Sequence, residues 1–427
     1  MTSFHIARRA FSALLAGTTL LLAACGGGND NNDSGPTQWR VLNLSSELTS
    51  LDVYTDNDKR FADVAADALA PYATIESGSY NVRITSAGNP TSLLRGTYSL
   101  SKERHYTGVV WGRAGSVKFA TVPEDDDTNV IGTGNARIRV YSATTDAGSF
   151  DVHLTLPAAD LGDPTIGSIT AATLGGYRDV TAGTYRLRVT GAGDINDVRL
   201  DVPEITLNEK TYSTLILTGT AGGVLVNGTL LAQQGAATPL KNTQARVRTV
   251  AGADANGTVA VQFDGTTFSG GLRSPTIGSY QRVTAGDRVV NVLVNGSSVS
   301  NTTRTIAAGG DYTLLAYGTN SVALIADDNR LPVAGRYRVR LVNGTTSADP
   351  LTLSVDYAAL VSDITAGNAS QSVTASINSS ARVDVTSTAG IDPLYVATDV
   401  NLQSFGVYSV FVLGGNATPT GVLRKDR

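Results

Sequence analysis

Short runs in which polar and apolar residues alternate recur along most of the chain, and this period of two is typical of half-buried β-strands. In the stretch GTYRLRVT (183–190), Tyr185, Leu187 and Val189 take every second position, with Thr or Arg between them. No stretch keeps a period of 3.6 residues. The segment FADVAADALAPY (61–72) is therefore predicted to be a strand and a loop rather than a helix. The pattern predicts an all-β protein.

Three landmarks recur in the same order four times, which indicates tandem repetition. The first is a strand: WRVLNLSS (39–46), ARIRVYSA (136–143), ARVRTVAG (245–252) and YRVRLVNG (337–344). The second is a turn and strand: YATIESGSYNVRIT (72–85), YRDVTAGTYRLRVT (177–190), YQRVTAGDRVVNVLV (280–294) and a degenerate SQSVTASINSSARVDV (370–385). The third is a tyrosine strand: HYTGVVWG (105–112), TYSTLILTG (211–219), DYTLLAYG (311–318) and VYSVFVLGG (407–415).

The spacing of these landmarks predicts four modules, at residues 38–130, 135–240, 244–333 and 336–427. Roughly seven short strands in each predict an immunoglobulin-like antiparallel β-sandwich. The Asn-Gly pairs at 227–228, 295–296 and 343–344 are predicted to form two-residue hairpin turns. The short spacers between modules favour limited bending but leave open both a rigid rod and flexible beads.

The first residues carry a processing signal rather than part of the fold. Arg8 and Arg9 precede an apolar run, residues 11–24, which is too short for the roughly 20 residues of a membrane span. Residues 1–24 are therefore predicted to be a signal peptide. The sequence LAAC at 22–25 resembles the bacterial lipobox, whose cysteine is acylated and becomes the mature amino terminus. The alternative is an ordinary signal peptide with a chance cysteine.

The lipobox resemblance implies that Cys25 carries acyl chains such as palmitate and that the membrane is a partner through them. Two or three chains anchor stably, whereas one chain binds only marginally. Residues 25–37, rich in glycine, asparagine and aspartate, are predicted to be a flexible tether. Gly26 is not an aspartate, which by resemblance to enterobacterial lipoproteins implies the outer membrane, facing either the periplasm or the cell surface.

The order of motifs resembles the domain-of-unknown-function 4397 family (DUF4397), β-sandwich modules found in tandem on exported bacterial proteins. The match is clearest in RVLNLSSELTSLDVYTD (40–56), GSYNVRITSAG (78–88) and YTGVVWG (106–112). The second module keeps YRDVTAGTYRLRVTGAG (177–193), the third keeps the ends, and the fourth has lost the central tyrosine and glycine. The resemblance covers residues 38–427. It implies a fold and an exported setting, and it brings no catalytic residues.

Composition narrows the choice of function. The net charge of −4 would become −6 once Arg8 and Arg9 leave with the signal, and no dense basic stripe occurs, so no nucleic-acid partner is expected. With its single cysteine acylated, the mature chain is expected to form no internal disulfide. Burial of apolar residues in several cores must then supply its stability.

Candidates for chemistry are few. After removal of the signal only His105 and His153 remain, in different modules, which leaves no raw material for a histidine-based metal site or a catalytic triad. His105 is expected to be an exposed residue at a strand edge. The acidic stretches at 124–127 and 327–328 are interpreted as solvated, self-repelling turns, with calcium binding as the alternative. No cofactor, no catalytic residue and no metal ligand is predicted.

The two tryptophans, Trp39 and Trp111, both fall in strand patterns and are expected to pack rather than to form a platform for sugars. The sequence therefore predicts a non-enzymatic, lipid-anchored cell-envelope protein with a structural, adhesion or binding role. The alternative is a glycan- or polymer-binding module that assists a separate enzyme. A third possibility, an unrecognised hydrolase, has no nominated pair of acids.

Overall fold

The computed structural model describes residues 34–427 except residues 114, 389, 391 and 416–418. Within these residues there are strands throughout and no α-helix, and the sole helical element is a 3₁₀ turn at Asp254–Asn256. The predicted all-β fold class is confirmed. The strand and loop predicted for residues 61–72 are also confirmed, because the third strand runs to residue 65 and a turn follows it.

The first module contains eight strands in two sheets. One sheet has the order β4-β1-β7-β8 and the other the order β3-β2-β5-β6. Their bounds are β1 (Pro36–Ser45), β2 (Ser50–Thr55), β3 (Asp58–Ala65), β4 (Ala73–Glu76), β5 (Gly78–Ser86), β6 (Ser92–Leu100), β7 (His105–Arg113) and β8 (Ser116–Pro123).

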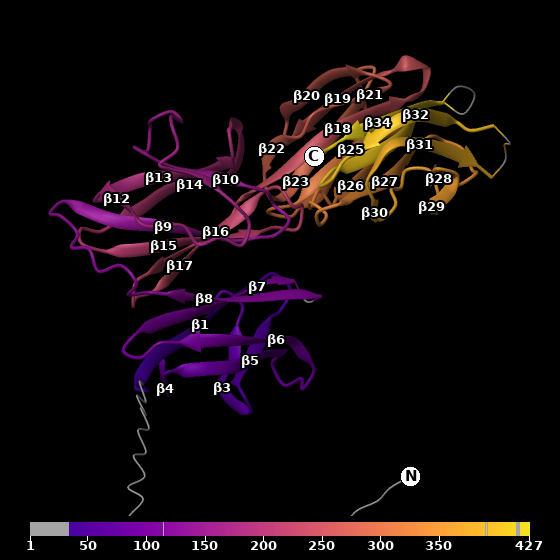
Figure 1. The fold of residues 1–427 in the computed structure, drawn as a ribbon. Coiled ribbons are helices and arrows are strands. Elements are labelled where there is room, and N and C mark those ends of the chain that lie inside the picture. The colour runs from indigo at the N-terminus through magenta and orange to yellow at the C-terminus, as the bar shows by residue number, and fades with distance from the viewer. Residues whose placement is uncertain (1–33, 114, 389, 391, 416–418) are drawn as a thin grey trace, which may run out of the picture.

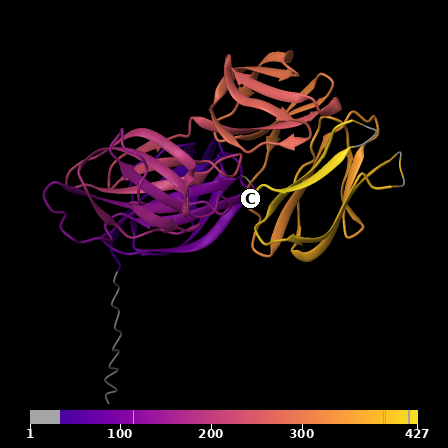
Figure 2. The ribbon, with the colours of Figure 1, turned by 90° about the horizontal axis from the view of Figure 1, so that it is seen from above.

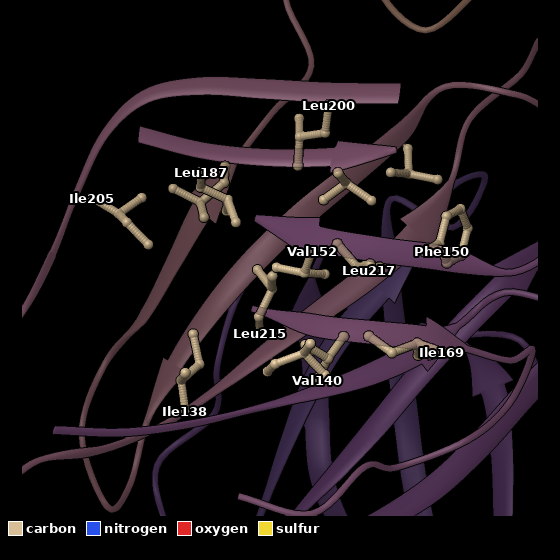
Figure 3. Close-up of a cluster of buried hydrophobic side chains, with 14 of the residues drawn as sticks. Ile138, Val140, Phe150, Val152, Ile169, Leu187, Leu200, Ile205, Leu215 and Leu217 are labelled. Atoms are coloured by element: carbon tan, nitrogen blue, oxygen red, sulfur yellow. The ribbon is translucent and has the colours of Figure 1, made fainter. Parts of the chain in front are cut away.

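The second module repeats this plan with one added edge strand, in the orders β12-β9-β15-β16-β17 and β11-β10-β13-β14. Its strands are β9 (Asn135–Ala143), β10 (Phe150–Thr155), β11 (Ile166–Ile169), β12 (Arg178–Thr181), β13 (Gly183–Gly191), β14 (Asp194–Leu207), β15 (Tyr212–Gly219), β16 (Val226–Ala232) and β17 (Ala237–Leu240). Figure 3 shows the apolar side chains of both sheets meeting in its core, among them Ile138, Phe150 and Leu217.

The third module has the orders β21-β18-β25-β26, with β22 also pairing β18, and β20-β19-β23-β24. Its strands are β18 (Gln244–Ala253), β19 (Thr258–Phe263), β20 (Thr266–Arg273), β21 (Thr276–Ile277), β22 (Gln281–Thr284), β23 (Gly286–Val294), β24 (Ser297–Ile306), β25 (Asp311–Gly318) and β26 (Ser321–Asp327).

The fourth module returns to eight strands, in the orders β30-β27-β33-β34 and β29-β28-β31-β32. Its strands are β27 (Arg336–Gly344), β28 (Leu351–Val355), β29 (Ala358–Ile364), β30 (Val373–Ser376), β31 (Asn378–Ser387), β32 (Tyr395–Leu402), β33 (Val407–Leu413) and β34 (Thr420–Lys425). Each module encloses its own cluster of buried apolar side chains between its two sheets.

One strand pair in each module is parallel, a detail that the sequence pattern did not predict. The first strand of each module runs parallel to the strand of the third landmark, in the pairs β1/β7, β9/β15, β18/β25 and β27/β33. All other pairs in the described residues are antiparallel. In modules 1, 3 and 4 the tyrosine of the third landmark closes the turn before this strand: Tyr106, Tyr312 and Tyr408 accept backbone N–H groups from five residues upstream. This arrangement is like the tyrosine corner of immunoglobulin-like sandwiches.

The Asn-Gly pairs do not all form turns. Asn295 and Gly296 have positive φ and connect β23 to β24, as predicted. The prediction is wrong for Asn227 and Gly228, which lie inside β16. Glycine is needed at position 228 because a Cβ atom there would lie 3.2–3.4 Å from atoms of three leucines. It is also wrong for Asn343, which is buried in β27 and donates a hydrogen bond to a carbonyl oxygen of the facing sheet.

The four modules form two face-to-face pairs (Figures 1 and 2). Modules 1 and 2 pack through the sheets that carry β1 and β9, and modules 3 and 4 through those that carry β18 and β27. The first interface buries Leu42, Leu44, Val109, Trp111 and Val122 against Tyr141, Ala143, Ile216 and Leu231. The second buries Val250 and Leu315 against Val342, Phe411 and Leu413. The chain is therefore neither a straight rod of modules nor a string of separate beads.

Candidate functional site

A buried arginine stands at the same place in the first strand of every module: Arg40, Arg139, Arg248 and Arg340. Each points away from its own core and into the interface with the paired module. In each case Nε donates to the hydroxyl directly opposite on the parallel strand, over 2.8–3.0 Å: Thr107, Thr214, Thr313 and Ser409. We call these four sets the arginine clusters.

A carboxylate compensates each buried guanidinium. Arg40 makes a two-pronged pair with Glu124, at 3.0 and 2.8 Å, and Arg139 pairs with Asp126 at 2.8 Å. A buried charge without such a partner would be strongly unfavourable. The four arginine clusters therefore depend on acids at the ends of modules 1, 3 and 4.

Modules 3 and 4 exchange their acids. Arg248 of module 3 pairs with Asp426, which follows the last strand of module 4, at 2.5 Å. Arg340 of module 4 pairs with Asp327, at the end of the last strand of module 3, at 2.7 Å. Each module thus supplies the charge that the other one needs, and neither interface surface is electrostatically complete alone.

A tyrosine covers the guanidinium in three of the clusters. Tyr72, Tyr177 and Tyr280 lie 4.5, 4.3 and 4.6 Å from Arg40, Arg139 and Arg248 respectively, measured from ring centroid to guanidinium carbon. In module 4 the degenerate second landmark has Ser370 here, and its hydroxyl accepts the N–H of Leu341 instead. The central tyrosine of the repeat is thus a cation–π partner in the first three modules.

Burial and charge act in opposite directions on the acid at the centre of the second interface. Burial alone would raise the pKa of Asp327, but the charges of Arg340 and Arg248 outweigh it and lower that pKa below its ordinary value. Burial raises the pKa of Tyr280 well above its ordinary value, and its hydroxyl donates to Asp327 at 2.6 Å. Asp327 is therefore a carboxylate held by two guanidiniums and two hydroxyls.

The interpretation of the acidic stretches as solvated turns is wrong for Glu124 and Asp327, which are both buried. Their neighbours are also paired: Asp125 with His105, Asp127 with Arg137, and Asp328 with both Arg330 and Arg338. The repulsion expected among adjacent acids is offset because each acid has its own basic partner. In the described residues no group of three or more His, Cys, Asp or Glu side chains is placed to hold a metal ion.

The two histidines in the described residues lie in different modules. His105 is half-buried on β7, between β1 and β8, so the expected strand-edge position is wrong. Its Nδ1 lies 3.0 Å from Asp125, and its ring packs edge-on against Tyr72. His153 is buried in module 2, with Nε2 3.2 Å from the hydroxyl of Thr190. Both therefore have local structural partners.

The expected packing of both tryptophans is confirmed. Trp39 lies in the core of module 1, edge-on to Phe61 and Phe119. Trp111 is buried in the interface, where its Nε1 donates to the hydroxyl of Tyr141 in module 2 at 3.1 Å. Neither indole is open to a sugar ring, and Trp111 instead joins two modules.

A second kind of contact joins the two module pairs to each other. The guanidinium of Arg427 donates to the carbonyl oxygens of Gly223 (2.7 Å), Asn329 (3.2 Å), Asp146 (3.3 Å) and Ala147. Three of these oxygens belong to module 2, and Asn329 follows the last strand of module 3. Nearby, a cavity of about 180 Å³ lies where modules 1 and 2 meet Arg330.

The predicted lipidation site, Cys25, lies outside the described residues, as do the predicted signal peptide 1–24 and most of the tether. Nothing in the structure bears on them. Among the residues that the structure does describe, none form a helix with the length and apolar character needed to cross a membrane.

Four sandwiches joined face to face define this chain as a tandem β-sandwich protein. Residues 37–153 and 245–354 match the family described as Domain of unknown function (DUF4397). These stretches make up more than half of the chain, which therefore belongs to this family. Residues 154–244 and 355–427 lie outside the two matches. No curated protein sequence matches the chain.

Three solved structures show a limited likeness. The Bacillus anthracis TIE protein is 8% identical, covers 89% of this chain and 68% of its own, and has a TM-score of 0.14. A family-26 carbohydrate-binding module from Eubacterium rectale, solved with maltoheptaose, is 13% identical over 47% of this chain and 97% of its own, with a TM-score of 0.15. A fimbrial assembly protein from Parabacteroides distasonis is 11% identical over 48% and 98%, with a TM-score of 0.16. Scores this low establish no shared architecture, so nothing about function follows from them.

Proposed function

We propose that this protein is a non-enzymatic, lipid-anchored component of the bacterial cell envelope, whose four modules form one stiff body with a structural, adhesive or binding role. The observation that carries the proposal is the use of its ionisable residues. The four recurring arginines are buried at the interfaces between modules, where acids and tyrosines are their partners. Such residues hold modules in a fixed relation and are not presented to a substrate.

The anchor in this proposal is Cys25, acylated after removal of residues 1–24, with the outer membrane as the destination. Two acyl chains or more are needed for stable attachment. The chain from Cys25 to the first described strand is short, so the modules would be held near the membrane surface. Attachment of a stiff four-module body at one end suits a supporting or adhesive element of the envelope.

The experiment combines a pull-down from envelope extracts with a deletion strain. The proposal expects the mature lipoprotein to recover a defined envelope partner and the deletion to alter envelope integrity or adhesion. Arg248→Met, which loosens the body without touching its outer faces, is expected to keep the anchor and to weaken the phenotype partially. Recovery of no partner together with an unchanged deletion phenotype would contradict the proposal.

One observation favours the second candidate, a glycan- or polymer-binding role. Tyr357 stands at the tip of the β28–β29 hairpin, 81% exposed, with a φ of 66°. A bulky residue in this left-handed region is uncommon, and such outliers cluster at functional sites. Module 3 has Gly265 at the same place. Retention on a polysaccharide column that is lost in Tyr357→Ala would support this role, and equal elution of both proteins would remove it.

A further inference from the structure

A single row of side chains crosses the outer face of the β3-β2-β5-β6 sheet in module 1. Direct pairing places Lys59 on β3 opposite Tyr54 on β2, Tyr54 opposite Arg83 on β5, and Arg83 opposite Arg95 on β6. The flanking residues of β5, Val82 and Ile84, are buried in the core, so the row faces outward. We call these four residues the basic row.

Two of the three charges in the basic row are not compensated. Lys59 pairs with Asp52 at 2.7 Å. Arg83 instead stacks on the ring of Tyr54, at 3.7 Å from the centroid, and Arg95 is exposed. Among the described residues neither arginine forms an ion pair. Like charges directly opposite each other on neighbouring strands are destabilising, so the fold carries a cost at this row.

The other modules do not carry this arrangement at the equivalent positions. Module 2 has the row His153, Arg188 and Asp201, which includes its own acid. Module 3 has Gln262, Asn291 and Asn301, which are uncharged, and module 4 has Ser354, Asp384 and Val396. Since the repeat does not require positive charge here, the basic row is a property of module 1.

The basic row also lies on a free face. Module 1 meets module 2 through the sheet with β1, β7 and β8, so the sheet with β3, β5 and β6 faces away from the rest of the protein (Figure 1). This module is the one nearest the predicted anchor. The ten residues from Cys25 to Gly35 span at most about 35 Å, so this face is within reach of the bilayer surface.

We propose that the basic row docks module 1 on the anionic lipid headgroups of the membrane that holds Cys25. This inference rests on the proposed lipid anchor. The guanidiniums would meet headgroup phosphates, for which the planar fork of arginine is suited. An acyl anchor combined with a basic patch is a known two-signal form of attachment. The docking fixes which face of the four-module body turns toward the bilayer and leaves modules 3 and 4 directed away from it.

The test uses the full mature lipoprotein in vesicles of phosphatidylethanolamine with or without phosphatidylglycerol. A fluorophore on Thr97→Cys, an exposed position on the same sheet face, reports contact with a quencher attached to lipid headgroups. A fluorophore on Asn301→Cys in module 3 is the distant reference. We expect quenching at residue 97 only in the anionic vesicles, reduced by added salt because these charges are exposed.

The variant Arg83→Gln/Arg95→Gln should lower the ratio of docked to undocked protein about 30-fold, at roughly fivefold for each cation near the surface. The matched control is Arg178→Gln/Arg282→Gln, which removes two exposed cations from modules 2 and 3 and should change nothing. Equal melting temperatures of both variants by circular dichroism show that the fold is kept.

Each outcome separates the docking from the anchor. Vesicle flotation that retains the protein without quenching at residue 97 overturns the docking alone. Equal loss in the row variant and the control variant also overturns it, because general charge would then explain the effect. Failure of the protein to float with any vesicle, with no acyl mass on Cys25, overturns the anchor and the docking together.

Discussion

Replacing Asp327 with asparagine tests the arginine clusters most severely, because this side chain serves both modules of the second pair. Its carboxylate is fully buried, 2.7 Å from Arg340 and 3.9 Å from Arg248. It also accepts hydrogen bonds from Thr313 and Tyr280, each at 2.6 Å. Asparagine keeps the shape and removes the charge, so the change isolates electrostatics from packing.

The expected loss of unfolding free energy follows from the burial of the Asp327–Arg340 ion pair. Removing one partner of a buried ion pair typically costs about 3–5 kcal/mol, since the remaining charge has no counterion. Arg248 keeps Asp426 at 2.5 Å, so only Arg340 loses its partner and the lower end, about 3 kcal/mol, is expected. For a unit of this size that corresponds to a fall of about 6–12 °C in the melting temperature.

The assay compares two signals in one thermal or urea titration. Both tryptophans are buried in module 1 or its interface with module 2, so their fluorescence follows the first pair. Far-ultraviolet circular dichroism follows the strands of all modules. Asp327→Asn should shift the circular dichroism transition and leave the tryptophan transition nearly in place. The second change Arg340→Met should recover part of the loss by removing the stranded charge.

Two results would refute this reasoning. A shift within about 0.5 kcal/mol, the range of ordinary surface substitutions, would mean that Asp327 is not the counterion of Arg340. Strict additivity of Asp327→Asn and Arg340→Met would mean that the two groups do not interact.

Three further outcomes are expected. Glu124→Gln should lower the melting temperature reported by tryptophan fluorescence and leave that of modules 3 and 4 nearly unchanged, because Arg40 in the first interface loses its counterion. An unchanged tryptophan melting temperature would contradict this. For Asp328, burial would raise the pKa, but hydrogen bonds from Arg330 and Arg338 lower it, so its contribution is full above the ordinary pKa of 3.8 and is lost as the pH falls through the lowered value. The stability difference between wild type and Asp328→Asn in urea titrations should therefore be constant near neutral pH and shrink below pH 3.8, and a difference that grows in acid would be inconsistent with the ion pairs. Arg427→Ala should increase the radius of gyration in small-angle X-ray scattering, because it removes the donor to four carbonyl oxygens between the pairs, whereas Arg424→Ala, whose bond stays within the second pair, should not; equal values for both variants would argue against this joint.

The repeats, the strands and the sandwich class could be predicted because they depend on local periodicity. The four arginines and the tyrosines are visible in the sequence as landmarks of the repeat. Their role as ion-pair and cation–π partners at the interfaces between modules is not. Whether Arg248 meets Asp327 or Asp426 depends on how modules pack, and that contact joins residues far apart in sequence. A signal was present in β1, where Leu42 and Leu44 alternate with Val41, so that both faces of the strand are apolar. Two-sided burial of this kind indicates an element covered on both faces.

The acidic stretches were misread for a related reason. Adjacent acids such as those at 124–127 repel one another in an isolated loop, and sequence alone offers no partner for them. In the fold, each of these acids pairs with an arginine or histidine of a different strand. Module 2 has Gln233 at the position of Glu124 in module 1. The Asn-Gly pair at 227–228 is a strong local signal for a turn, but in the fold it lies within a strand that is closely packed around Gly228.

Both the proposed function and the docking of module 1 require the membrane anchor at Cys25. Mass spectrometry of the amino terminus of the protein purified from membranes tests it directly. We predict a chain that begins at Cys25, lacks residues 1–24, and carries the mass of two or three acyl chains on that residue. A mature protein with an unmodified Cys25, or one that retains residues 1–24, would contradict the lipid anchor.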